Sequence, residues 1–186
     1  MRLWEITNDL IDQVSMLVVT DEDRLNFSFW DQFRDDGSSM HWNKRPKLQP
    51  FVDKKRKKQK PRADISPFRP GGLALNGKAR DALGDFLSQF GQLLEIDVLG
   101  EVEYYYNVTN VLTSVDLNQS EVVPGGFVKK PAFNASSVPS QATVFKDAAV
   151  LSSIYVNDAA KLELENRIAE SGIRGIGFKQ VWGAAS

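Results

Sequence analysis

Two carboxylates, Glu101 and Glu103, could carry out chemistry because their spacing places them on one face of a strand. Paired acids support general acid–base catalysis when a pocket moves their pKa values apart. The acids in 21–23 form a second such group, within a turn. The sequence around neither group indicates a pocket, so we expect solvated charges, which at a strand edge also discourage aggregation.

Other reactive residue types are scarce. His41 is the single histidine, and it lies in HWNKRP, away from any nucleophile elbow, so a surface position or loop packing against Trp42 is favoured over catalysis. The chain has no cysteine and no HExxH or EF-hand spacing. The segment GIRGIG, 172–177, indicates a helix end followed by a turn, since a phosphate cradle needs the opposite strand-to-helix order. We therefore expect no catalytic, cofactor-binding or metal-binding residues, and a protein that is not an enzyme.

The most unusual stretch is DKKRKKQKPR, 53–62, with seven cations in ten residues. Segment 43–62 holds ten Lys or Arg and one acid, whereas the rest of the chain has a net charge of −10. A nucleic-acid-binding arm is one interpretation, in which the cations of 54–62 neutralise phosphates. However, no aromatic residue is interleaved for base stacking, and the acidic body would repel phosphates. We therefore favour a solvated loop that attracts an acidic protein partner, and nucleic acid remains the alternative.

These residues must be positioned by the elements around them. Apolar runs predict strands at 2–6 and 15–19, which we expect to pair with each other, and the alternation of Leu25, Phe27 and Phe29 predicts another. Residues 1–37 thus form a group of N-terminal strands. Five prolines within 38–72 predict a long irregular basic loop.

In the second half of the chain, the residues that mark the ends of helices and strands are easier to identify. Asn76 is the expected cap of a helix that stops at Gly91, and Asn157 and Gly172 bound a second helix at 158–171. Strands are expected at 93–98 and 101–111 around Gly100, at 143–145, at 153–156 and at 176–182. Strands outnumber helices without regular alternation. We therefore predict one α+β domain with a mainly antiparallel sheet, two principal helices and a long basic loop.

The location of the protein is approached by exclusion. The first dozen residues include acids and lack an unbroken apolar stretch, so a signal peptide is not expected. No run reaches the ~20 apolar residues that a membrane span needs. The expected location is the cytoplasm, without membrane attachment.

Several motifs arrive in a characteristic order from Arg62 onward: RADI, LALNGKARDAL, LLEIDV, YYYNVTNVLTSVDLNQS, ATVFK and IYVNDAAKLELENRIAESGIRGIGFKQV. This order resembles the predicted bacterial immunity proteins of polymorphic toxin systems, immunity family eleven, also called the myxobacterial-type immunity domain. The positions that match the family pattern are Asn107, Val108, Asp116, Ser120, Gly172, Gly175 and Phe178. Residues 73–186 thus form an immunity-like α+β region. Asn76 departs from the pattern, which usually has Ser there, and the basic stretch 54–60 is not part of it.

The resemblance implies a bacterial antidote that binds a cognate toxin, encoded by a neighbouring gene and delivered between competing bacteria. Such a protein works by protein–protein interaction and needs neither cofactor nor catalytic residue. Recognition would rest on aromatic anchors and complementary charge. The candidate partner-binding residues are Trp30, Phe33, Trp42, Lys54, Lys55, Arg56, Lys57, Lys58, Lys60 and Arg62.

Overall fold

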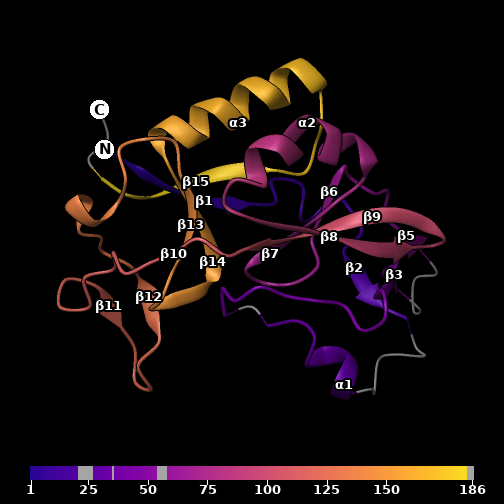
Figure 1. Cartoon of the computed structure of the whole chain (residues 1–186), viewed down its shortest axis with the longest axis horizontal. Helices are drawn as coiled ribbons and strands as arrows, with labels where there is room; N and C mark the ends of the chain where they lie inside the picture. Colours follow the sequence, from indigo (N-terminus) through magenta and orange to yellow (C-terminus); the bar gives the residue numbers. More distant parts are fainter. Residues whose placement is uncertain (21–26, 35, 54–57, 184–186) are drawn as a thin grey trace.

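The hairpin of β8 (Gly91–Val98) and β9 (Glu101–Val108) forms the middle of the larger sheet (Figure 1). The chain is seen in a computed structural model that describes residues 1–20, 27–34, 36–53 and 58–183. The two strands stay in register from Gly91 opposite Val108 to Val98 opposite Glu101. The turn between them places Gly100 at φ +90°, which glycine adopts readily, as the sequence predicted. The sheet has the strand order β2-β3-β8-β9-β7-β6, where the other members are β2 (Leu17–Val19), β3 (Lys47–Pro50), β6 (Ile65–Ser66) and β7 (Gly72–Leu75).

A second sheet has the order β10-β13-β14-β1-β15. Its members are β1 (Leu3–Thr7), β10 (Val111–Leu112), β13 (Val144–Asp147), β14 (Val150–Asn157) and β15 (Gly177–Trp182). Strand β1 pairs antiparallel with β14 on one side and with β15 on the other. A small hairpin of β11 (Glu121–Val122) and β12 (Val128–Lys130) extends beside this sheet, with a turn at 123–126.

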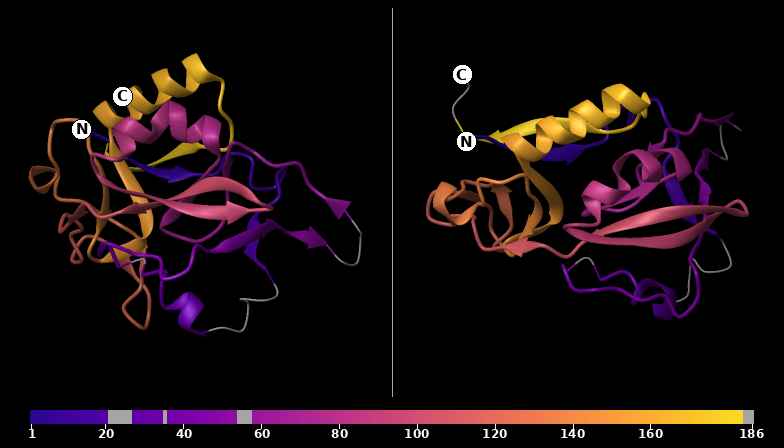
Figure 2. Two further views of the ribbon diagram at one scale, coloured as in Figure 1. Left: turned by 45° about the vertical axis from the view of Figure 1, so that its right-hand side comes forward. Right: turned by 45° about the horizontal axis from the view of Figure 1, so that its top comes forward.

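The helices α2 (Gly77–Leu87) and α3 (Asp158–Ser171) lie side by side over the sheets (Figure 2). Their predicted caps are confirmed: Asn76 Oδ1 accepts from Ala79 N, and Asn157 Oδ1 accepts from Ala160 N. The α2 face of Ala79, Leu83, Phe86 and Leu87 is buried, and it joins one core cluster with residues of both sheets. The predicted α+β class, with two principal helices, is therefore confirmed.

The first turn of α3 is fastened to β1. Asp158 accepts hydrogen bonds from Arg2 N, from the Arg2 guanidinium and from Trp4 Nε1 at 2.8–3.1 Å. Burial alone would raise the pKa of Asp158, but these donors outweigh it and hold the pKa below its ordinary value. The ionised carboxylate therefore connects two segments that are far apart in the sequence.

Some N-terminal predictions are wrong. Strands β1 and β2 do not pair with each other, because β1 joins β14 and β15 whereas β2 pairs with β3. Residues Phe27–Trp30 form a short helix, α1, instead of a strand; Leu25 lies outside the described residues. Phe29, within this helix, and Phe33, just after it, are both buried in one core cluster.

The expected irregular loop at 38–72 is also a correction, since it contains β3, β6 and a small hairpin of β4 (Val52–Asp53) and β5 (Lys58–Gln59). Pro50 fits into β3 for a geometric reason. Lys47 O accepts from Thr20 N and Phe51 N donates to Met16 O, and Thr20 and Met16 flank β2 directly. The residues of β3 that bond toward β2 therefore alternate, and Pro50 occupies a position where no N–H is needed for that pairing. Proline content alone therefore misled the prediction.

The stop predicted at Gly91 is wrong as well. Helix α2 ends at Leu87, and Ser88 provides its C-cap. Gly91 instead opens β8, where a Cβ would lie 2.2 Å from Asn107 O of the facing strand. The glycine thus permits a close strand approach and does not mark a helix end.

Within the described residues, no helix is both long and apolar enough to cross a membrane.

Candidate functional site

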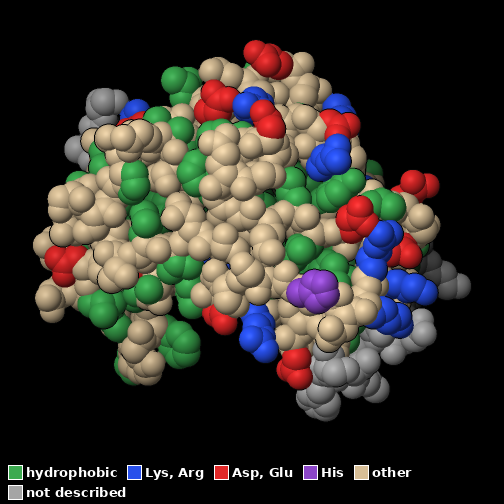
Figure 3. Space-filling model, in the orientation of Figure 1, with side chains coloured by type: hydrophobic (Ala, Val, Ile, Leu, Met, Phe, Trp, Pro, Cys, Tyr) green, Lys and Arg blue, Asp and Glu red, His purple; other side chains and the backbone are tan. Residues whose placement is uncertain are grey.

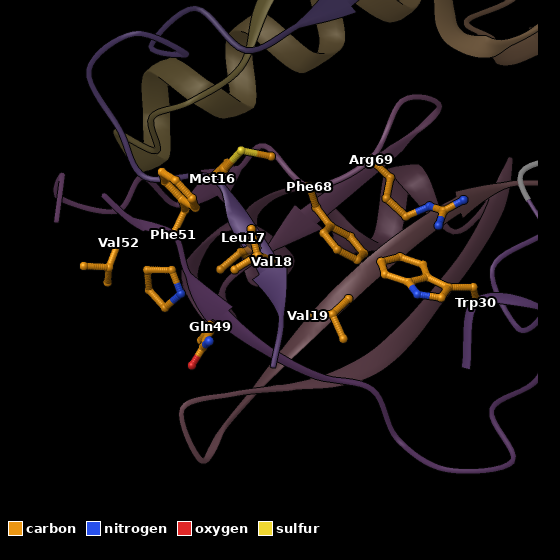
Figure 4. A pocket seen from close by; sticks show the side chains of 11 residues that line it. Met16, Leu17, Val18, Val19, Trp30, Gln49, Phe51, Val52, Phe68 and Arg69 are labelled. Atoms are coloured by element: carbon orange, nitrogen blue, oxygen red, sulfur yellow. The ribbon is translucent and has the colours of Figure 1, made fainter. Parts of the chain in front are cut away.

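An apolar groove of about 550 Å³ lies at β2, the edge strand of the larger sheet (Figure 4). It is the candidate site because large apolar side chains remain in solvent there. The residues that line it are Met16, Leu17, Val18, Val19, Trp30, Gln49, Pro50, Phe51, Val52, Phe68 and Arg69.

One wall of the groove is built by β2, β3 and the start of β4. Phe51 N donates to Met16 O at 2.8 Å, which fixes the two side chains at neighbouring positions. Phe51 keeps 50% of its surface exposed, and Met16 and Val52 each keep 43%. Three exposed apolar side chains around one hollow favour a docking surface over a random scatter of surface residues.

The opposite wall is aromatic and carries a charge. Leu17 N donates to Pro67 O, which holds the segment containing Phe68 and Arg69 against the outer edge of β2. The Arg69 guanidinium lies 5.5 Å from the centroid of the Trp30 ring and 5.1 Å from that of Phe33. A cation over aromatic faces is stabilised by the ring quadrupole, so positive charge is built into this wall.

The three aromatic anchors predicted from the sequence have different positions. Trp30 lines the groove. Phe33 is buried, with its ring centroid 4.8 Å from Trp42 and 5.4 Å from Tyr105, so its proposed role as a surface anchor is wrong. Trp42 is half-buried against Phe33 and does not line the groove. Aromatic type alone could not separate core from surface.

The basic residues predicted to bind a partner also differ in position, and some of them lie outside the described residues. Lys54, Lys55, Arg56 and Lys57 lie outside the described residues, and of Lys58 only the backbone, paired with Asp53, is described. Lys60 is exposed, and its Nζ donates to Asp12 O at 2.8 Å. Figure 3 shows Lys and Arg side chains gathered on the side of the molecule where β3–β5 lie. The basic segment 43–62 includes Gln49, Pro50, Phe51 and Val52, so it also forms part of the groove wall.

Arg62 does not belong with these surface cations. Its Nη1 and Nη2 donate to the two carboxylate oxygens of Glu103 at 2.5 and 2.6 Å. Glu103 is 5% exposed, which corrects the expectation that both strand acids are solvated; Glu101 is exposed as expected. The expected partner-binding role of Arg62 is therefore replaced by an internal ion pair between the 60s segment and β9.

Two further motifs identified in the sequence are His41 and the glycine-rich segment 172–177. His41 is exposed. The predicted helix end and turn in 172–177 are confirmed, because Gly172 has φ +62° and Gly175 has φ +98°. A Cβ on Gly175 would lie 2.2 Å from Ile65 O, so only glycine allows the turn to pack against β6.

Residues that carry the family resemblance make contacts within the fold. Asn107 Nδ2 donates to Ser38 O at 2.9 Å. Ser120 Oγ donates to Asp116 O and accepts from Ala132 N, which joins the two ends of the β11–β12 hairpin. These contacts explain why such residue types suit these positions, and they serve the architecture of the domain.

The large pKa shifts belong to buried phenols. Burial raises the pKa of Tyr155 to about 12 and also raises the pKa of Tyr106, whose hydroxyl donates to Leu87 O. Neither tyrosine lines the groove. In the described part of the chain, no group of three or more His, Asp or Glu side chains is arranged to hold a metal ion.

The sequence matches no protein-family model and no curated protein.

Proposed function

We propose that this protein is a bacterial immunity protein that binds and neutralises a cognate toxin encoded by a neighbouring gene. The motif order beginning at Arg62 supports the class, and the groove supports a mechanism by protein–protein contact. The observation that carries the proposal is the exposure of Phe51, Met16 and Val52 around one hollow. Such side chains gain free energy when a partner removes them from water. The work of this protein would then be done in the cytoplasm, where the toxin acts.

Blocking by contact requires only that the toxin be bound tightly and in the right place. Aromatic side chains at the centre of an interface dominate binding energy, while charges around them accelerate encounter and exclude unsuitable partners. The groove combines both, because Trp30 and Phe68 line it together with Arg69, and Phe51 belongs to the basic segment 43–62. No catalytic residue of the antidote takes part in this mechanism.

The test is co-expression of the toxic neighbouring gene product with this protein in bacteria. Wild-type protein should restore growth, and purified toxin should bind it in isothermal titration calorimetry. Phe51→Asp should weaken binding of the toxin by about 100-fold, because it places a charge where the bound toxin would bury an apolar side chain. A loss of that size is typical of a central anchor of an interface. Phe51 is half exposed, so the variant should remain folded.

Phe127→Asp is the matched control, since Phe127 is 74% exposed and lies between β11 and β12, on the opposite side of the molecule from β2 and β3 (Figure 1). This variant should bind and protect like wild type. A toxic neighbour that stays lethal alongside the wild-type protein would contradict the proposed function.

The alternative, a nucleic-acid-associated regulator, depends on the cations of 54–62. We expect no shift of duplex DNA or single-stranded RNA in electrophoresis at about 150 mM salt, because few phosphate contacts survive screening there. A variant with Gln at 54–58 and 60 should behave identically toward nucleic acid, yet it should bind the toxin more slowly. Strong wild-type binding that the substitutions abolish would instead support the regulator.

A further inference from the structure

The groove also indicates what it binds. Resting on the proposed function, we infer that its occupant is an acidic polypeptide segment of the partner that inserts a bulky apolar side chain against Phe51, Phe68 and Trp30. The inference combines the shape of the groove, the residues that line it and the sign of the charge around it.

The apolar part of the inference follows from the hollow itself. A volume of about 550 Å³ is within the range of sites that take large apolar groups. The side chains of Phe51 and Met16 lie at one end in Figure 4, and those of Trp30 and Phe68 lie toward the other. An aromatic or long aliphatic side chain could contact this surface along its length, and contacts of that kind provide most of the binding energy.

The occupant is expected to be acidic because Lys and Arg residues border the groove. The wall formed by 49–52 belongs to a segment with ten Lys or Arg and one acid, and the facing wall contains Arg69. Lys47 is exposed and lies two residues before Gln49, hence on the same face of β3. Carboxylates beside the inserted side chain would be attracted to this side of the molecule, whereas a basic segment would be repelled.

The experiment selects ligands without assuming their sequence. A phage library of random dodecapeptides is panned on wild-type protein, with the Phe51→Ser protein present as unlabelled competitor. We expect enriched peptides to carry two or more Asp or Glu around a Trp, Phe or Leu. Synthetic versions should bind wild type about tenfold more tightly than Phe51→Ser, as for one truncated anchor. Replacing their acids with amides should cost a similar factor.

Phe127→Ser serves as the matched control and should bind the peptides like wild type. Circular dichroism and thermal unfolding establish that both variants are folded. Basic or uncharged consensus sequences, peptides that bind Phe51→Ser equally well, or no enrichment at all would overturn the inference. It would also be overturned if sedimentation velocity found a wild-type dimer that Phe51→Ser dissociates, because a second copy would then occupy the groove.

The inference and the proposed function fail in different ways. If the chain protects against the toxin equally well with Ser at position 51, the groove inference is overturned while immunity stands. If acidic peptides bind the groove but the chain does not protect, the inference is supported and the immunity function is overturned.

Discussion

Arg62→Met should lower the free energy of unfolding by about 3 kcal/mol, because Glu103 is buried and loses the partly buried guanidinium that compensates its charge. Both oxygens of Glu103 accept from the Arg62 guanidinium, and Arg62 Nη2 also donates to Ser66 Oγ at 3.3 Å. Met preserves much of the apolar stem of the side chain, so the loss reports mainly on the charge. Urea denaturation followed by tryptophan fluorescence measures it.

Arg45→Met is the matched control. Arg45 pairs with Glu95, but both side chains are about half exposed, so the expected loss is below about 1 kcal/mol. The double variant Arg62→Met, Glu103→Leu should regain much of the stability, since an apolar pair can replace a buried ion pair. Equal losses for Arg62→Met and Arg45→Met would contradict the internal role assigned to Arg62.

Asn157→Ala should cost about 3 kcal/mol, combining a lost helix cap with buried groups left unpaired. Asn157 is almost fully buried. Its Oδ1 accepts from Ala160 N and Thr143 N, while its Nδ2 donates to Pro139 O and Gln141 O. One side chain thus joins α3 to the segment before β13. Thermal and urea unfolding measure the change.

Asn157→Asp separates the two contributions. It retains the acceptor for the cap but faces two carbonyl oxygens with a carboxylate, so we expect it to be as destabilising as Ala. Asn76→Ala, at the more accessible cap of α2, should cost only about 1 kcal/mol. If Asn157→Asp were as stable as wild type, the carbonyl contacts would not contribute as described.

Local signals predicted the fold best. Asn76, Asn157 and Gly172 identify helix ends because a cap depends on residues within one turn. Gly100 likewise identifies the β8–β9 hairpin, whose strands are neighbours in sequence. The pairing of β1 with β14 and the insertion of β3 beside β8 depend on partners far away in the chain, which no local pattern specifies.

The site was predictable only in part, because burial is a property of neighbours. The sequence could nominate Trp30, but nothing local indicated that Phe33 turns into the core or that Phe51 stays outside. Arg62 and Lys60 have the same charge and lie two residues apart. The buried carboxylate of Glu103 distinguishes them, and it comes from a strand about forty residues later.

The position of β1 between β14 and β15 has a consequence for the order of synthesis. A ribosome makes β1 long before these two neighbours, which begin about 150 and 175 residues later in the chain. Until then the apolar side chains of β1 have no sheet to join, and closing so large a loop is slow. The nascent chain must therefore keep this strand without its sheet partners while the residues between β1 and β14 are made, and the second sheet is completed only when β15 has left the exit tunnel.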